Sequence, residues 1–495
     1  MDWQIMNWRL QVIEKILPTA LQRKTHETTS ILYNILDNIL SVRPPLRKEI
    51  IGSGLVVLLA GCAQTPMSVG DMSDKISAEL AAASTNSTEP VAVSGGFAVA
   101  IAQAVETNAG YRASLSRERE ATSMVGVAES VRKPQMGVNA NLGGLREFDA
   151  AGDAVTGIGG GFNLSQLIYD GGESLAAVNR VTAEALEARA ERVASANALA
   201  LEVARAWIDV WQFEERVRLL RSRTSEMDVM VGQMERMAAN GYADRAALDR
   251  ARRQIVDVRL EETRLQSDLA DAKVRFRRYF RQQPEKLGRP AEIVTPVLAR
   301  AQEKAWKKAP SLEARAAGLI AARHGVEEAQ AALGPRIRLQ TGLITPLDKA
   351  EGVSGNIGFG FDYSFFDGKR RVHQLEASIA RQMALEDQFY EEATTIQAEL
   401  AASLARLSGL ERSMPLVVEQ VRLSASEAET ARSQIATGQA TLRQMVEAEV
   451  ENYRAIDREV TIRAERHLLL LTIAARTGEL GRLLGLRAEV SPKEH

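Results

Sequence analysis

Hydrophobic and polar residues alternate in four short stretches of this chain, arranged as two pairs, and a very long helical pattern follows each pair. The first pair ends at Tyr169-Asp170-Gly171-Gly172 and the second at Phe366-Asp367-Gly368-Lys369. A shorter helical pattern precedes each pair and stops at a proline, Pro134 or Pro335. Because the two prolines lie 201 positions apart and the two Asp-Gly turns 197 apart, one helix–hairpin–helix unit occurs twice.

The alternating stretches predict β-strands with one apolar and one polar face. In the last of them, for example, Ile357, Phe359 and Phe361 alternate with Gly358 and Gly360. A half-buried hairpin on a soluble core is the commoner cause of such a pattern, but nothing else in the chain supplies an apolar layer for these faces. Strands of about ten residues are also long enough to cross a membrane when they are tilted.

Four strands are too few to close a barrel, and an open sheet edge is not tolerated in lipid. If the strands cross a membrane, several chains must therefore pool them. Three copies would supply twelve strands, although this argument does not itself select the number three.

The helical patterns that follow the hairpins are unusually long. From Glu173 to Asn240 there is no proline and only one glycine, which predicts a helix of roughly 100 Å at about 1.5 Å per residue. A partner helix is expected at 244–281, and the second copy predicts helices at 370–436 and 442–482. Pro415 falls inside the long helix of the second copy and is expected to kink it.

Each helix pair turns at a glycine, Gly241 or Gly438, which fits the left-handed position that ends a helix. Thr441 is a plausible N-cap for the helix that follows the second turn. On structural grounds alone these segments are ordinary helix turns.

Composition argues against several classes of function. Charged residues make up 25% of the chain, the net charge is −2 and aromatic residues make up 5%. The balanced charge provides no basic footprint for nucleic acid. The five histidines are scattered along the chain, so we expect no metal site. No phosphate-binding loop, nucleophile elbow or CxxC pair occurs, and we therefore predict a protein without enzymatic activity or cofactor.

Cys62 is the only cysteine, and it ends an apolar run that begins at Ile50. Arg43, Arg47 and Lys48 precede the run, which is the layout of a secretory signal. About a dozen apolar residues are too few to span a bilayer. The alternative is a buried thiol in a short core helix. Leu59-Ala60-Gly61-Cys62 also resembles the bacterial lipobox, which implies acylation of Cys62, and Ala63 at the next position implies transport to the outer membrane.

About 45 residues precede this signal, where a signal normally starts the chain. We interpret them as an upstream start codon chosen in error, with a functional cytoplasmic extension as the alternative. The expected divisions are a signal region at 1–61, a lipidated flexible tether at 62–95, a first repeat at 96–283, a linker at 284–297, a second repeat at 298–485 and a tail at 486–495. The expected strands lie near 135–146, 155–169, 336–346 and 353–366.

Taken together, the duplicated units, the aromatic-Asp-Gly exits, the glycine turns and the lipobox resemble the TolC-like outer membrane efflux proteins. The similarity covers roughly residues 96 to 485. It implies an α+β membrane protein, a homotrimer with a shared 12-stranded β-barrel and a long α-helical barrel. Such proteins are passive ducts that dock onto a periplasmic adaptor protein and an inner-membrane pump or ABC exporter, in drug efflux or type I secretion.

The resemblance also implies roles for particular residues. The helix tips would dock the adaptor, and they comprise Asn240, Gly241, Tyr242, Thr437, Gly438 and Gln439. Family members often carry acidic residues six and nine positions after the second tip glycine, where they line a constricted entrance. Here these positions are Gln444 and Glu447, so an acidic ring would rest on Glu447, helped by Glu449. Glu447 on a solvated helix face is the alternative interpretation.

The two aromatic-Asp-Gly motifs are then expected at the junction of barrel and tunnel: Tyr169, Asp170, Gly171 and Gly172, and Phe366, Asp367 and Gly368. A different class of function stays open at this stage, a lipid-tethered periplasmic coiled-coil scaffold or adaptor protein. That class predicts one helical hairpin and a separate β domain, whereas this chain has two copies with glycine-rich amphipathic strands.

Overall fold

The structure is a computed structural model that describes residues 68–85, 89–145, 155–240, 245–285, 287–290, 305–345, 353–436 and 439–486. The chain divides into two units, Met1–Ser87 and Thr88–His495. The expected signal region, Cys62, residues 291–297 of the expected linker and residues 487–495 of the tail lie outside the described residues.

The described part of the first unit is a helix, α4 (Val69–Thr85), where the sequence predicts a flexible tether. The helix starts at a reciprocal cap, in which the Asp71 backbone N–H donates to Ser68 Oγ (3.1 Å) and the Ser68 N–H donates to Asp71 Oδ2 (3.3 Å). This cap and the alanines that follow favour a helix over a coil.

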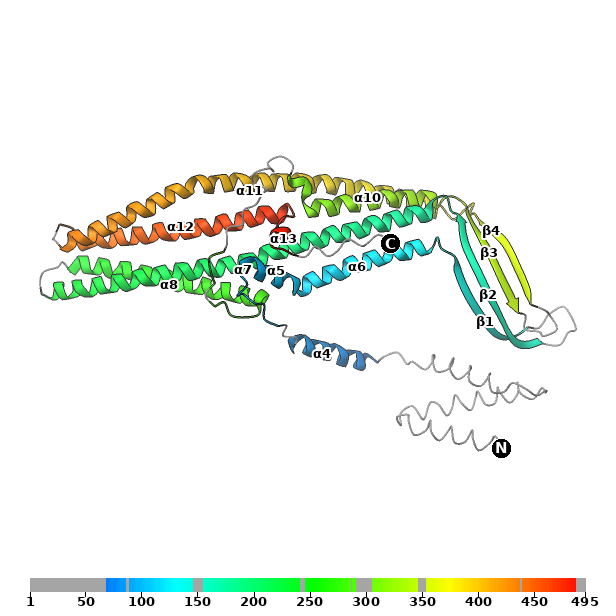
Figure 1. Ribbon diagram of the computed structural model, residues 1–495, viewed down its shortest axis with the longest axis horizontal. Coiled ribbons are helices and arrows are strands. Elements are labelled where there is room, and N and C mark those ends of the chain that lie inside the picture. The colour runs from blue at the N-terminus through cyan, green and yellow to red at the C-terminus, as the bar shows by residue number, and fades with distance from the viewer. Residues whose placement is uncertain are drawn as a thin grey trace, which may run out of the picture. The chain divides into compact units, whose positions relative to one another are not determined.

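The second unit contains a four-stranded antiparallel sheet in the order β1-β2-β3-β4 (Figure 1). The strands are β1 (Gln135–Leu145), β2 (Val155–Tyr169), β3 (Arg336–Thr345) and β4 (Ser354–Asp362). The two hairpins join through β2 and β3, where Phe162 lies opposite Leu343. The two copies of the repeat therefore share one sheet.

The last strand is shorter than expected: β4 ends at Asp362 and not at 366. Asp362 pairs with Arg336, the first residue of β3. Pro335 precedes Arg336 and has no N–H to donate, so the ladder stops there.

Helices lead into the sheet and out of it. They are α5 (Phe97–Glu106), α6 (Ala109–Ser130), α7 (Glu173–Ala239), α8 (Arg245–Phe280), η1 (Ala305–Lys308), α10 (Pro310–Ala331), α11 (Arg370–Ala436), α12 (Leu442–Arg476) and α13 (Leu480–Leu483). The long helices predicted after each hairpin are confirmed, each with 67 residues, and α11 stays helical across Pro415. α12 ends at Arg476 and not near 482, because Gly478 turns into the left-handed region (φ 73°).

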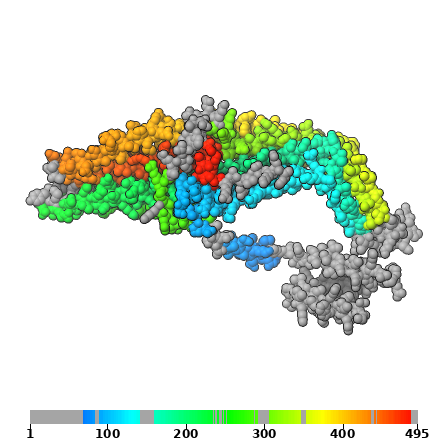
Figure 2. All heavy atoms as spheres, viewed as in Figure 1, coloured from blue at the N-terminus to red at the C-terminus, as the bar shows by residue number. Residues whose placement is uncertain are grey.

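The helices of the second unit form a single-layer wall rather than a globular bundle. Beside the sheet, α7 packs against α6 and α10, and α10 packs against α11. Towards the tips, α7 packs against α8 and α12, and α12 packs against α11. Figure 2 shows the green atoms of α8 and the second half of α7 directly beside the orange atoms of α11 and α12. The outer sides of α6, α8 and α11 face no other described helix of the chain.

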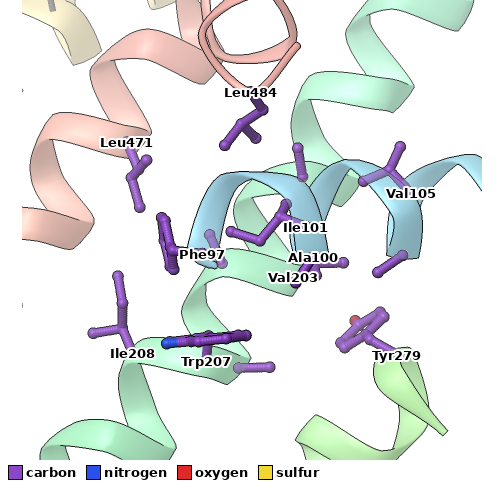
Figure 3. Close-up of a cluster of buried hydrophobic side chains, with 14 of the residues drawn as sticks. Phe97, Ala100, Ile101, Val105, Val203, Trp207, Ile208, Tyr279, Leu471 and Leu484 are labelled. Carbon is purple, nitrogen blue, oxygen red and sulfur yellow. The ribbon is translucent and has the colours of Figure 1, made fainter. Parts of the chain in front are cut away.

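The largest apolar cluster lies midway along the wall, where α5 packs on α7, α8 and α12 (Figure 3). Trp207 of α7 lies at its centre, with ring centroids 5.8 Å from both Phe97 and Phe280. Phe276 stacks on Phe280 at 4.2 Å. Aromatic contacts of this kind each add about 0.5–1.5 kcal/mol beyond the area that they bury, so the cluster holds α5 and the start of α6 to the long helices.

Candidate functional site

The two faces of the sheet differ in chemistry, as the alternation predicts. On one face, Val138, Ile357 and Phe359 are 83%, 77% and 73% exposed. The pairing places Phe162 beside Val138, and Leu339 beside Phe359, on the same face. No described element covers this apolar face, and a face of this kind requires lipid or another protein chain.

The opposite face carries neutral amides that lie across glycines of the neighbouring strand. Asn163 is paired with Gly137, and Asn139 with Gly161. A Cβ added to Gly137 or Gly161 would lie only 2.9 or 2.8 Å from the amide oxygen of its partner. The glycines thus leave room for the amides beside them, and Arg336 and Arg338 of β3 lie on the same polar face.

At the first junction, Asp170 caps α7. Its Oδ1 accepts from the Gly172 N–H (3.0 Å) and its Oδ2 from the Ser174 N–H (2.7 Å). Partial burial opposes ionisation of Asp170, but the hydrogen bonds from Ser174 and Gly172 and the charge of Arg132 hold its pKa below the usual value. Gly171 and Gly172 have φ values of 67° and 92°, which only glycine adopts without strain.

At the second junction, Asp367 accepts from Arg371 Nε (2.8 Å), and this hydrogen bond lowers the pKa of the carboxyl. The same guanidinium donates to the Ala332 carbonyl (2.9 Å) and to the Ser364 carbonyl. Gly368 has φ 68°, and Lys369 has φ 67° at the position of Gly172 in the first copy. Left-handed backbone costs a non-glycine residue roughly 1–2 kcal/mol.

The aromatic residues of the two junctions are exposed to different degrees. Tyr169 is half exposed, and Phe365 and Phe366 are 90% and 84% exposed. Tyr169 pairs with Ile337 on the apolar face of the sheet, whereas Phe365 and Phe366 lie beyond the end of β4.

Of the helix-tip residues, Asn240 is the last described residue after α7, and Gln439 is described after α11. Gly241, Tyr242, Thr437 and Gly438 lie outside the described residues. After the second tip, Thr441 and Gln444 form a capping box at the start of α12. Gln444 Oε1 accepts from both the backbone N–H and the hydroxyl of Thr441, each at 2.8 Å.

The three residues expected at the entrance do not lie together. Gln444 and Glu447 are exposed and line a groove of about 790 Å³ between α11 and α12. Glu449 is only 2% exposed, and its Oε2 accepts from Arg223 Nη1 of α7 (3.0 Å). Arg432 of α11 lies 2.5 Å from its other oxygen. The expectation that Glu449 helps to line a lumen is therefore wrong for this chain.

Sequence reasoning missed the role that Glu449 does play, which is to join three helices inside one protomer. The signal was present, because Glu449 lies on the same helical stripe as the buried residues Met445, Val446 and Asn452. A charged residue on a buried stripe indicates a buried ion pair.

A second ion pair joins α7 and α12 further from the tip, and it was also not predicted. Arg216 donates to both oxygens of Asp457, at 2.6 and 3.1 Å. Burial, with Asp457 close by, raises the pKa of Tyr453 beside this pair. The bidentate geometry makes this one of the stronger types of ion pair.

In the described part of the chain, no group of side chains could hold a metal ion. None of the described helices has both the length and the apolar character needed to cross a membrane.

Comparison with solved structures defines the class of fold. CusC superposes with a TM-score of 0.66 at 17% identity, covering 78% of this chain and 90% of CusC. VceC of Vibrio cholerae superposes with a TM-score of 0.66 at 18% identity, covering 78% of this chain and 95% of VceC. The open state of MtrE of Neisseria gonorrhoeae superposes with a TM-score of 0.66 at 16% identity, covering 77% of this chain and 88% of MtrE. The fold is therefore TolC-like, with long helices that continue antiparallel strands. A search of curated protein sequences finds no match.

The family model of the outer membrane efflux proteins matches residues 100–280 and 302–479. The chain belongs to the outer membrane efflux protein family. It is thus an efflux channel of the outer membrane that extends into the periplasm in a tripartite system, and not an enzyme. Membership of this family decides against the scaffold and adaptor alternative.

Proposed function

We propose that three copies of the chain join edge to edge into one passive exit duct, with a twelve-stranded barrel in the outer membrane and a helical tunnel below it. The observation that carries this proposal is the pair of unpaired edges on the sheet. β1 and β4 each have one neighbour, and unpaired strand edges are not tolerated in lipid. Pairing β4 of one protomer with β1 of the next leaves no edge after the ring closes.

The helices have unpaired edges on the same two sides. Beside the sheet, α11 exposes an apolar stripe of Val372, Ile379 and Met383, and α6 exposes Met124 and Val127. The two α6 residues lie within about ten residues of the end of α6, and the three α11 residues lie within about fourteen residues of the start of α11. Both stripes are therefore on the parts of these helices nearest the sheet.

Towards the tips, the exposed apolar residues include Val256 and Leu260 on α8 and Leu416 and Leu423 on α11. Val256 lies eleven residues after the start of α8, and Leu423 thirteen residues before the end of α11. Apolar residues are thus exposed on both open edges at two levels of the wall, beside the sheet and towards the tips.

Cysteine cross-linking tests this arrangement. Val127→Cys combined with Val372→Cys should produce disulfide-linked trimers in membranes, because the two edges meet between protomers and these positions lie at similar distances from the sheet. The matched control is Leu186→Cys with Ile320→Cys, two exposed positions on α7 and α10 in the interior of the wall. A purely monomeric species in both pairs, together with no SDS-resistant oligomer, would contradict the duct.

We further propose that a periplasmic adaptor protein, coupled to an inner-membrane pump or ABC exporter, docks on the tips formed around Asn240, Gly241 and Tyr242 and around Thr437, Gly438 and Gln439. The support is that α7 and α11 end, and α8 and α12 begin, at the end of the wall away from the sheet. Insertion of two residues at 241 should abolish export without reducing the trimer, and unchanged export would exclude docking there.

The signal before Cys62 supports a lipid anchor at this residue in the outer membrane. Palmitate labelling of cells should mark the wild type and not Cys62→Ser. Equal labelling of both proteins would exclude lipidation at this position.

A further inference from the structure

Four exposed cationic residues lie where the helices meet the sheet, two on each open edge of the wall. Arg132 and Lys133 follow the end of α6, while Lys369 precedes α11 and Arg370 begins it. Lys133 and Arg370 form only long ion pairs, at 3.5 and 3.9 Å, with carboxylates three or four residues earlier in the chain. Arg132 and Lys369 form no ion pair with any residue that the structure describes, and the charge of Arg132 acts on Asp170 from a greater distance.

The carboxylates nearby do not balance these four charges. Three of them already bind other groups at the junctions, namely Asp170, Glu173 and Asp367. Glu129 is the ion-pair partner of Lys133, and Asp362 at the end of β4 forms no ion pair within the described residues. Two carboxylates against four cations leave an excess of positive charge.

The two cationic pairs lie at equivalent levels of the repeat. Arg371, next to the second pair, donates to the carbonyl of Ala332 at the end of α10 (2.9 Å). Ala332 stands three residues before Pro335. In the first copy, Val131 stands three residues before Pro134, and the first pair follows it directly. Each proline is followed at once by a strand of the same sheet, so both pairs mark the height at which helix becomes strand.

The two pairs are separated in one protomer and come together only between protomers. This step rests on the proposed function, in which α11 of one protomer adjoins α6 of the next. Each of the three seams then contains Lys369 and Arg370 of one protomer and Arg132 and Lys133 of its neighbour, and we call these four residues the seam cluster. Like charges that meet in this way repel one another, so the seam is more stable when an anion lies among them.

Exposed aromatic side chains lie directly beside the seam cluster. Phe365 and Phe366, between the end of β4 and Lys369, are 90% and 84% exposed. The ring of Tyr363 packs edge-on against Phe365, with centroids 5.2 Å apart. Apolar rings next to unbalanced cations match a ligand that carries both an acyl chain and a negatively charged head.

Local structure does not explain the lysine in this cluster. Lys369 has φ 67°, which strains any residue with a Cβ, whereas Gly172 takes the corresponding position in the first copy with φ 92°. A glycine at 369 would remove the strain. A strained lysine at an exposed position points to a use for its charge outside the backbone.

We propose that the seam cluster binds the phosphate of an anionic phospholipid in the periplasmic leaflet of the outer membrane, and that this lipid joins neighbouring protomers. Its acyl chains lie against Phe365 and Phe366. The guanidinium groups of Arg132 and Arg370 offer paired N–H donors, which suit phosphate oxygens. A zwitterionic lipid brings its own ammonium group into the seam and therefore offsets less of the repulsion.

Native mass spectrometry of the purified full-length trimer tests the proposal, with phosphatidylglycerol and phosphatidylethanolamine added in turn. The wild type should retain phosphatidylglycerol preferentially, and its SDS-resistant trimer should dissociate at a higher temperature with this lipid. Arg132→Gln/Lys369→Gln should weaken retention by roughly tenfold or more, because each cation near a lipid surface contributes separately, and should remove the temperature difference.

Two controls separate charge from other effects. Arg132→Lys/Lys369→Arg keeps both charges and should behave as the wild type does. Arg412→Gln removes an exposed cation of α11 roughly 60 Å from the junction, and it should also leave lipid retention unchanged.

Equal retention of phosphatidylglycerol by the wild type and by Arg132→Gln/Lys369→Gln would overturn the proposal while leaving the trimer intact. The same holds if inorganic phosphate alone raises the dissociation temperature as much as the lipid does, because the site would then recognise a free anion. The absence of a trimer in every lipid, for the wild type as well, would overturn the proposed function itself.

Discussion

The long helices of the two repeats, α7 and α11, have the same length and the same place in the repeat, but their surroundings differ. Sixteen apolar side chains of α7 are buried, against six of α11, among the residues that the structure describes. α7 packs against α6, α8, α10 and α12, whereas α11 packs against α10 and α12. One copy of the helix is thus the interior of the wall and the other is its edge.

Both long helices form ion pairs with their neighbours, but those of α7 reach more elements, since the pairs of α11 are with α12, α10 and α7. α7 is paired with β3 through Glu173 and Arg336, with α10 through Arg180 and Glu328, and with α6 through Arg192 and Glu118. It is also paired with α12 and at several levels with α8. Alanine-rich faces allow helices to slide, and cross-helix pairs at defined heights fix which residues lie opposite one another. A duplicated unit thus acquires two roles because the two copies occupy different places along one open sheet.

The largest effect is expected from the interior helix. Trp207→Ala should lower the free energy of unfolding by about 3–5 kcal/mol, because it empties the centre of the aromatic cluster. The matched change on the edge helix is Tyr390→Ala, because the Tyr390 side chain is 59% exposed. This variant should reduce the amount of trimer more than the stability of the protomer. Circular dichroism melting and native electrophoresis measure the two quantities. Equal destabilisation of the protomer by both changes would contradict the division.

Glu449→Ala should cost about 3 kcal/mol, the lower end of the range for breaking a buried ion pair. It leaves Arg432 without this partner, while Arg223 keeps Glu226 at 2.8 Å. Chemical denaturation checks the value. Glu427→Ala on the exposed side of α11 serves as the control and should change stability by less than about 0.5 kcal/mol.

Met383→Glu addresses the edge directly. The Met383 side chain is 61% exposed in the single chain, and burying a methionine contributes about 1.5–3 kcal/mol. A carboxylate there should therefore reduce the SDS-resistant trimer while leaving the helix content of the protomer unchanged. Leu186→Glu on the exposed face of α7 should leave the trimer intact, and a similar loss from both variants would argue against α11 as the edge.

The pH dependence of stability tests the charged cap at the first junction. The folded-state pKa of Asp170 is lower than its ordinary value of 3.8. The stability it contributes is therefore fully present above pH 3.8 and is lost as the pH falls through the lower folded-state pKa. Asp170→Asn should flatten the acid limb of a stability–pH curve and have its full destabilising effect near neutral pH. An unchanged acid limb would show that the cap carries no charge-dependent stability.

The smallest effect is expected at the position where the copies differ. Lys369→Gly should stabilise the second junction by about 0.5 kcal/mol, because relief of the left-handed strain exceeds the extra chain entropy of glycine. Gly172→Ala should destabilise the first junction by about 1 kcal/mol. Melting temperatures of the two variants should thus move in opposite directions, and a shift in the same direction would contradict the backbone argument.

Much of the fold could be predicted because it depends on short-range patterns. The strands follow from strict alternation, and the 67-residue helices from long segments with almost no glycine or proline. The exits at Asp170 and Asp367 follow from local capping chemistry and glycine conformation. These features involve residues close together in the chain, so their physics is visible in the sequence.

Other features could not be predicted because they depend on which segments meet. The end of β4 at Asp362 depends on Pro335, which precedes the neighbouring strand β3. The burial of Glu449 depends on arginines 226 and 17 positions away. A lumen position and a buried ion pair are both compatible with a glutamate near a helix tip, and only packing distinguishes them.

The sequence by itself therefore determined that the chain contains one unit twice, with amphipathic strands and very long helices, because periodicity and capping act over a few residues. Only the tertiary structure decided that α7 is interior and α11 an edge, and that Glu447 faces solvent beside Arg443 while Glu449 does not. The reason is that the two repeats have nearly the same local patterns, and their different neighbours arise when both hairpins join one sheet through β2 and β3.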